Sequence, residues 1–152
     1  MKLNELLNID LIDLNLDASS IKEVLKKMTD SLFLNKRITD KGMFYKDVLK
    51  REKIESTNME IGIAIPHSYA TCIKKSSVAI VRLVKPIRWG SSEELVEFVF
   101  LLLASPTDPG ITHLELISKI AELLIEDSFI QFLKTNDDPK SLINKIIDMV
   151  EE

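Results

Sequence analysis

Apolar and polar residues follow patterns along the chain that predict four strands. Residues 10–16 alternate polar and apolar side chains, which is typical of a half-buried strand at the edge of a sheet. Residues 98–104 are apolar without a break, which indicates a strand buried on both faces. The apolar stretch 61–65 predicts a short strand that Pro66 ends, and residues 77–83 predict another.

Two helices are predicted where apolar positions recur every three or four residues behind a capping signal. Ser20 and Glu23 form a capping-box pattern, and the spacing behind them predicts a helix over residues 20–34. Thr112 can cap a further helix, because apolar side chains recur at helical spacing from residue 114 to residue 124.

Two aspartates indicate where the other predicted helices begin. Asp40 can cap a helix that ends near Lys53. Asp138 is followed by Pro139, a pair that is typical of the first turn of a helix, and the apolar spacing extends this helix to residue 147. From the helix behind Asp40, the side chains expected to point inward are Met43, Phe44 and Val48.

The predicted elements combine into an α/β fold. Helices alternate with strands over the first part of the chain, and helices follow at its end. A turn is expected at Pro86 and a loop over residues 105–110, but no segment rich in Gly, Pro or Ser divides the chain. We therefore expect a single domain over residues 1–152, with a mixed β-sheet flanked by helices on both faces.

Composition narrows the classes of function. The 152 residues are 45% hydrophobic and 29% charged with a net charge of −4, which favours a globular protein and gives no basic surface for nucleic acid. The longest apolar run, residues 98–104, is too short to insert across a membrane. The only cysteine, Cys72, predicts a buried inert thiol. With no signal-peptide pattern at the start, we expect a cytoplasmic protein.

The candidate chemistry centres on the two histidines of the chain. His67 follows Pro66, and His113 lies at the start of the helix behind Thr112. Taken alone, each is most simply a polar residue at the surface, although a neutral imidazole is also a competent nucleophile near neutral pH. The histidines and Cys72 could join acidic residues around zinc, but no close pair has the spacing of metal ligands. Gly-rich phosphate loops and nucleophile elbows are absent.

Read together, several segments match a known family in order and spacing. Gly62-Ile63-Ala64-Ile65-Pro66-His67 resembles the active-site signature of the fructose/mannitol family of enzyme IIA domains, from the sugar phosphotransferase system. The further matching segments are Arg51-Glu52 with Thr57, residues 86–90, residues 99–106, and His113-Leu114. The resemblance therefore covers essentially the whole chain.

The resemblance implies a phosphocarrier. His67 would be the phosphorylated histidine, which receives its phosphoryl group from the carrier protein HPr and passes it to a cysteine of enzyme IIB on a separate chain. His113 would lie beside His67, Arg51 would bring positive charge to the phosphoryl group, and Thr57 would help to bind it. Both transfers run directly between protein side chains, so no metal and no cofactor is expected.

Three residues depart from the family pattern, and two alternatives stay open. Asn58 stands where Gly is frequent, Ser68 follows the histidine where Gly or Ala is common, and Tyr69 is bulkier than usual. One alternative is a regulatory, nitrogen-type enzyme IIA whose phosphorylation state signals to other proteins. The other is a binding domain with an inactive site. The sequence does not distinguish fructose, mannitol, galactitol or another polyol as the transported sugar.

Overall fold

The strands form one five-stranded mixed sheet. In the computed structural model, which describes residues 3–108 and 112–151, the strand order is β1-β4-β5-β2, and β3 also pairs with β5. The strands are β1 (Ile12–Leu16), β2 (Ile63–Ala64), β3 (His67–Ser68), β4 (Ser77–Ile87) and β5 (Val96–Leu103). Strand β4 runs antiparallel to β5 and parallel to β1, whereas β2 and β3 run parallel to β5. The predicted mixed sheet is therefore confirmed, with β1 at one edge.

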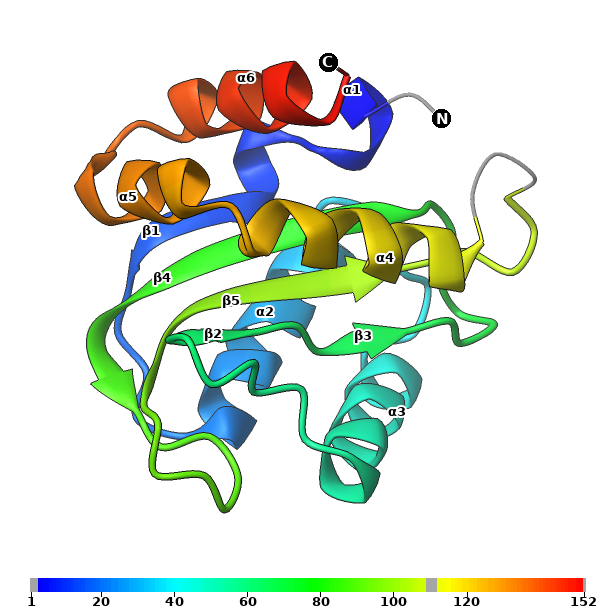
Figure 1. Ribbon diagram of the computed structural model, residues 1–152. Helices are drawn as coiled ribbons and strands as arrows, with labels where there is room; N and C mark the ends of the chain where they lie inside the picture. The colour runs from blue at the N-terminus through cyan, green and yellow to red at the C-terminus, as the bar shows by residue number, and fades with distance from the viewer. Residues whose placement is uncertain (1–2, 109–111, 152) are drawn as a thin grey trace.

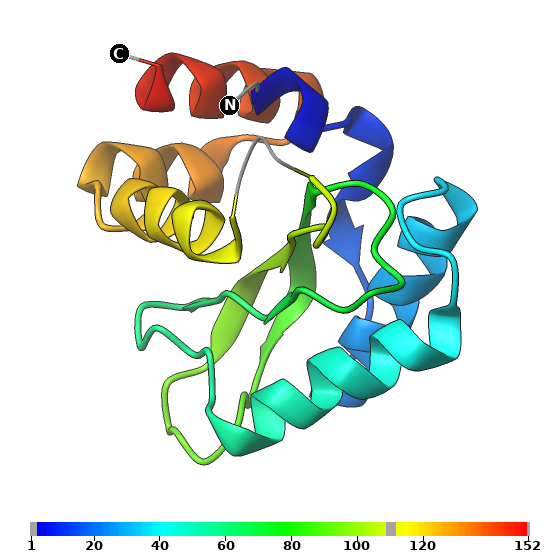
Figure 2. The ribbon, with the colours of Figure 1, turned by 90° about the vertical axis from the view of Figure 1, so that its right-hand side faces the viewer.

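Helices cover both faces of this sheet, as predicted. Figures 1 and 2 show α2 and α3 on one face and α4, α5 and α6 with the short α1 on the other. The helices are α1 (Leu3–Leu6), α2 (Ile21–Leu34), α3 (Lys41–Ile54), α4 (His113–Leu124), α5 (Asp127–Thr135) and α6 (Pro139–Val150), and a short 3-10 helix, η1, spans Ile9–Leu11. Within the described residues, no helix is both long and apolar enough to cross a membrane.

The predicted caps begin four of the helices. The Ser20 hydroxyl accepts a hydrogen bond from the Glu23 N–H at 3.1 Å, and the Asp40 carboxylate accepts one from the N–H three residues later at 3.0 Å. Thr112 caps α4 in the same way at 3.2 Å, and Asp138 caps α6 at 3.2 Å. Each cap satisfies an N–H that has no partner inside its helix.

Two apolar clusters fill the space between the sheet and its two helical layers. The cluster under α2 and α3 includes the fully buried Phe44 and Trp89. The cluster under α4, α5 and α6 includes the fully buried Phe100 and Phe129, whose rings meet edge to face at 6.4 Å. Since burial of each such side chain stabilises the fold by about 1.5–3 kcal/mol, the two clusters hold the layers together.

The expectation that Met43 points inward was wrong. Its side chain is 47% exposed, whereas Phe44, Val48 and Glu52 form the buried face of α3. These three lie at intervals of four residues and therefore share one side of the helix. Glu52 is a charged residue on that buried side, which apolar periodicity alone does not reveal.

The turn expected at Pro86 was also wrong. Strand β4 continues through Pro86 to Ile87, and its pairing with β5 is irregular between Arg82 and Ile87. Proline lacks the N–H of a regular ladder but is tolerated where the ladder is interrupted. The irregular stretch therefore accommodates Pro86 without ending the strand.

Other boundaries differ in smaller ways. The strand expected over residues 10–16 begins only at Ile12. Residues 10 and 11 belong instead to the short 3-10 helix η1, which Asn8 caps. The strand expected over residues 61–65 is reduced to Ile63–Ala64. Helix α5 was not predicted. Pro109 and Gly110 of the expected loop lie outside the described residues.

Candidate functional site

His67 lies at the edge of the sheet, where β3 pairs with the end of β5. It is the first residue of β3 and is in register with Leu102, whose N–H donates to the Pro66 carbonyl at 2.9 Å. The imidazole Nδ1 lies 3.1 Å from the Ile65 carbonyl oxygen. Because a carbonyl oxygen only accepts, Nδ1 carries the hydrogen, and the neutral ring keeps its lone pair on Nε2.

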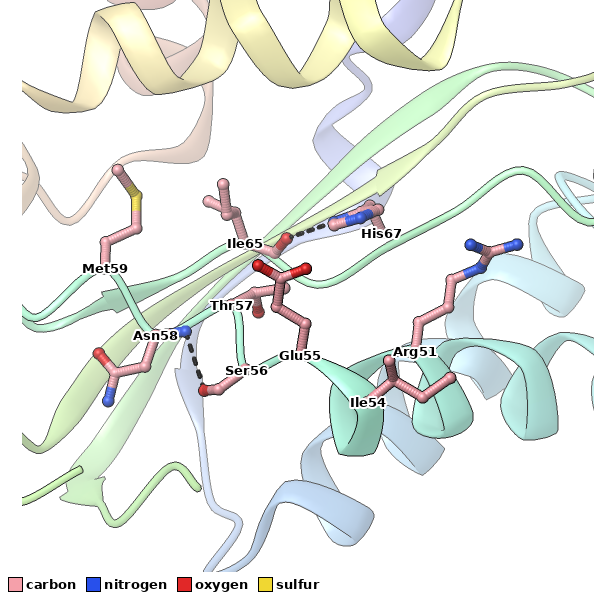
Figure 3. Close-up of a pocket in the computed structure, with 9 residues that line it drawn as sticks. All are labelled: Arg51, Ile54, Glu55, Ser56, Thr57, Asn58, Met59, Ile65 and His67. Carbon is pink, nitrogen blue, oxygen red and sulfur yellow. Dashed lines mark hydrogen bonds between the residues drawn. The ribbon is translucent and has the colours of Figure 1, made fainter. Parts of the chain in front are cut away.

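A pocket of about 430 Å³ opens beside His67 (Figure 3). It brings together His67, Arg51 and Thr57, three of the four residues that the sequence singled out. The complete lining is Arg51, Ile54, Glu55, Ser56, Thr57, Asn58, Met59, Ile65 and His67. Apart from the histidine, the titratable residues of this lining are Arg51 and Glu55, so a cation and an anion face the same space.

Arg51 is fixed near the end of α3 by a carboxylate one turn earlier. Its Nε donates to Asp47 Oδ2 at 2.9 Å, and the same oxygen accepts a hydrogen bond from the Ser68 hydroxyl at 2.5 Å. Burial lowers the pKa of the Arg51 guanidinium, but hydrogen bonds and charge interactions with Asp47 and Tyr69 outweigh it and raise the pKa above the ordinary value. Arg51 is therefore a permanent cation, and Asp47 connects it to the strand of His67.

Two hydrogen bonds to the Glu52 carboxylate hold Thr57 in the wall of the pocket. The Thr57 N–H donates to Glu52 Oε2 at 2.6 Å, and the Thr57 hydroxyl donates to the other carboxylate oxygen. The Thr57 carbonyl in turn accepts from the Ile65 N–H at 3.1 Å, and Ile65 is the residue that accepts from His67. A chain of hydrogen bonds therefore runs from α3 to the imidazole, and Thr57 contributes to it through its backbone.

His113 reaches this region through Tyr69. It is the first residue of α4, and it is not among the residues that line the pocket. Its ring stacks on the Tyr69 ring with centroids 4.3 Å apart and planes 26° apart. The Arg51 guanidinium carbon lies 4.0 Å from the centroid of the same Tyr69 ring. Tyr69 thus contacts two of the predicted site residues.

The residues that sequence reasoning left without a role are Asp47, Glu52 and Tyr69. Asp47 had a detectable signal, because an acid four residues before an arginine on a helix is a common pair. Tyr69 was noticed only as an unusually bulky residue. Its contacts with Arg51 and His113 join three separate segments of the chain, and no local pattern shows them.

Cys72 is buried, as predicted. Burial raises the pKa of its thiol above the ordinary value, which keeps the sulfur protonated near neutral pH. Since the nucleophilic form is the thiolate, this environment suits an inert side chain.

The comparisons with known proteins identify the family of the chain. The family model "Phosphoenolpyruvate-dependent sugar phosphotransferase system, EIIA 2" matches residues 5–149. The chain is 32% identical over 138 residues to multiphosphoryl transfer protein 1 of Escherichia coli K12. The matched region covers 91% of this chain and 16% of that relative. It is 29% identical over 126 residues to the fructose-like EIIA component of the same organism, covering 83% of this chain and 85% of the relative.

Solved structures share the fold. The nitrogen regulatory protein IIA-Ntr from Neisseria meningitidis superposes with a TM-score of 0.84 at 24% identity, covering 95% of this chain and 98% of that one. A complex of enzyme IIAMTL with phosphorylated enzyme IIBMTL from Escherichia coli gives a TM-score of 0.75 at 17% identity, covering 95% and 96%. At these identities the likeness establishes the architecture alone.

The fold and the sequence match define a phosphotransferase component, a phosphocarrier of the enzyme IIA type. The chain belongs to the EIIA 2 family of the phosphoenolpyruvate-dependent sugar phosphotransferase system. The chain spans about one sixth of the length of multiphosphoryl transfer protein 1.

Proposed function

We propose that His67 accepts a phosphoryl group from phospho-HPr on Nε2 and passes it to a cysteine of enzyme IIB during sugar uptake of the fructose, mannitol or galactitol type. The observation that carries the proposal is the hydrogen bond from His67 Nδ1 to the Ile65 carbonyl, because it leaves Nε2 as the nitrogen with a free lone pair. We place this relay in the cytoplasm.

The proposed transfer needs no added acid or base. The Nε2 lone pair attacks phosphorus, while the bond from phosphorus to the donor histidine breaks and returns its electron pair to that ring. Nδ1 keeps its hydrogen, so the Ile65 carbonyl stabilises the developing positive charge on the His67 ring. In the second step a thiolate of enzyme IIB attacks phosphorus, and the electron pair returns to Nε2.

Arg51 supports the proposed chemistry through its charge. Phosphoryl transfer passes through a loose transition state with negative charge on the equatorial oxygens, so preorganised cations and donors supply much of the catalysis. Arg51 lines the pocket with His67, and its Nε is occupied by Asp47, which leaves the terminal nitrogens to meet phosphoryl oxygens. We propose that His113 approaches the same oxygens from the α4 side, and that Thr57 acts by shaping the pocket wall.

A labelling experiment tests the proposal. The chain is incubated with enzyme I, HPr and phosphoenolpyruvate, and its mass is measured. We expect one added phosphoryl group that is labile in acid and stable in base, that is absent from His67→Ala, and that is present but formed more slowly in His113→Ala. Labelling that persists in His67→Ala would overturn the assignment of the nucleophile.

A second step of the same experiment separates transport from regulation. The labelled chain is mixed with enzyme IIB proteins of the fructose, mannitol and galactitol types. Transfer of the label to one of them supports the transport role and identifies the sugar class. Label that none of them accepts would instead support the regulatory, nitrogen-type alternative.

A further inference from the structure

The ring of Tyr69 contacts two charged or ionisable groups from different elements. The Arg51 guanidinium carbon, on α3, lies 4.0 Å from the ring centroid, and the His113 imidazole, on α4, stacks at 4.3 Å. Tyr69 therefore contacts both groups through one ring. Figure 2 shows α3 and α4 on opposite faces of the sheet, and the Tyr69 side chain contacts one residue of each helix.

Tyr69 is itself held close to His67. It follows Ser68, which is only 1% exposed and whose hydroxyl donates to Asp47 at 2.5 Å. The Ser68 carbonyl also accepts from the Ala104 N–H at 3.1 Å. Tyr69 therefore starts from a fixed backbone, although its side chain is 42% exposed at the rim of the site.

We propose that Tyr69 is a positioning residue for phosphoryl transfer, whose ring sets the separation between Arg51 and His113 and holds both beside the phosphoryl group on His67. This inference rests on the proposed function, and it assigns a role to a residue that departs from the family pattern. An arginine side chain has many rotamers, and both a carboxylate at Nε and an aromatic face at Cζ restrict them.

The face of the ring makes both of these contacts, and the hydroxyl adds a hydrogen-bond interaction with Arg51. Stacking on an imidazole and attraction of a guanidinium depend on the face of an aromatic ring, which phenylalanine also offers. Tyr69→Phe should therefore keep both ring contacts and lose only the interaction of the hydroxyl, whereas Tyr69→Leu removes the ring and leaves a smaller apolar side chain. Phe33, on α2 and outside the pocket lining, gives a matched control. It is 43% exposed, and the Lys41 ammonium lies 5.3 Å from the centroid of its ring.

Single-turnover phosphorylation by an excess of phospho-HPr, measured by rapid mixing, tests the positioning role. In Tyr69→Leu we expect the limiting rate constant to fall roughly tenfold, the combined effect of one cation–aromatic and one stacking contact, with little change in the half-saturating concentration of phospho-HPr. Phe33→Leu should retain the wild-type limiting rate constant, and Tyr69→Phe should retain most of it. A wild-type limiting rate constant in Tyr69→Leu overturns the proposal, as does a rise in the half-saturating concentration alone, which would make Tyr69 part of the docking surface. Equal loss in Tyr69→Phe also overturns it.

NMR of the unphosphorylated chain tests the geometry without any activity. Stacking on Tyr69 should shift the His113 ring protons upfield in the wild type and in Tyr69→Phe, and the shift should disappear in Tyr69→Leu. Unshifted His113 protons in the wild type would overturn the inference. If phospho-HPr fails to label even the wild type, the proposed function falls, while this spectrum still decides whether Tyr69 orders His113.

Discussion

The two faces of the sheet differ in how their helices are attached. On one face α3 is connected to the site by charged side chains, through Asp47 to Ser68 and through Glu52 to Thr57. On the other face α4, α5 and α6 meet the sheet mainly through apolar side chains, and Phe129 on Phe100 is an example. Hydrogen bonds to charged groups fix direction, whereas apolar burial is non-directional. Both faces therefore gain stability from apolar burial, and the α3 face has in addition directed hydrogen bonds that hold residues of the site.

The largest expected effect is on stability, and it concerns the face covered by α4, α5 and α6. Phe129→Ala should lower the free energy of unfolding by about 3–5 kcal/mol, because a fully buried aromatic ring is lost and a cavity remains. Chemical denaturation monitored by circular dichroism measures the loss. The rate of His67 phosphorylation per folded molecule should stay close to that of the wild type. A folded variant with a strongly reduced rate would contradict the division between the two faces.

The next effect is on chemistry and lies on the α3 face. Arg51→Ala should slow phosphorylation of His67 by about 10²- to 10³-fold, the usual result of removing one preorganised donor. Its melting temperature should change little, because the side chain is partly exposed and its ion pair with Asp47 is near the surface. Arg51→Lys should recover only part of the rate, since lysine lacks the planar fork. A large fall in melting temperature with an unchanged rate would reverse the assignment.

The smallest effect concerns the cap of α6. Hydrogen bonds from the Ser141 hydroxyl and the Lys140 N–H lower the pKa of Asp138 in the folded state. The stability from this ionised cap is fully present above the ordinary aspartate pKa, about 3.9, and is lost as pH falls through the lower folded-state value. Asp138→Ala should therefore have a slightly lower melting temperature than the wild type at pH 7, and the gap should narrow in acid. A gap that widens in acid would contradict this sign.

Much of the fold follows from local signals. The caps at Ser20, Asp40, Thr112 and Asp138 predicted where four helices begin, because each cap acts on backbone a few residues away. Helix α5 lacks this signal, because Glu126 before it makes no side-chain cap hydrogen bond and only a short break separates the helix from α4. Met43 was misplaced because α3 has few apolar residues, and the buried Glu52 completes its inner face.

Less of the site than of the fold could be predicted from the sequence. The resemblance selected His67, Arg51, His113 and Thr57, and the structure gathers three of them around one pocket. The contacts of Tyr69 with α3 and α4, and the bond between Asp47 and Ser68, join residues more than fifteen positions apart. Such contacts depend on how the layers pack around the end of β5, which no local pattern specifies.

The proposed relay depends most directly on which nitrogen of His67 takes the phosphoryl group. Long-range ¹H–¹⁵N correlation spectra of the uniformly ¹⁵N-labelled chain, recorded before and after treatment with enzyme I, HPr and phosphoenolpyruvate, distinguish the two ring positions. The bond from Nδ1 to the Ile65 carbonyl predicts that phosphorus is attached to Nε2 of His67 while Nδ1 remains protonated. Phosphorus on Nδ1, or on His113, would contradict it.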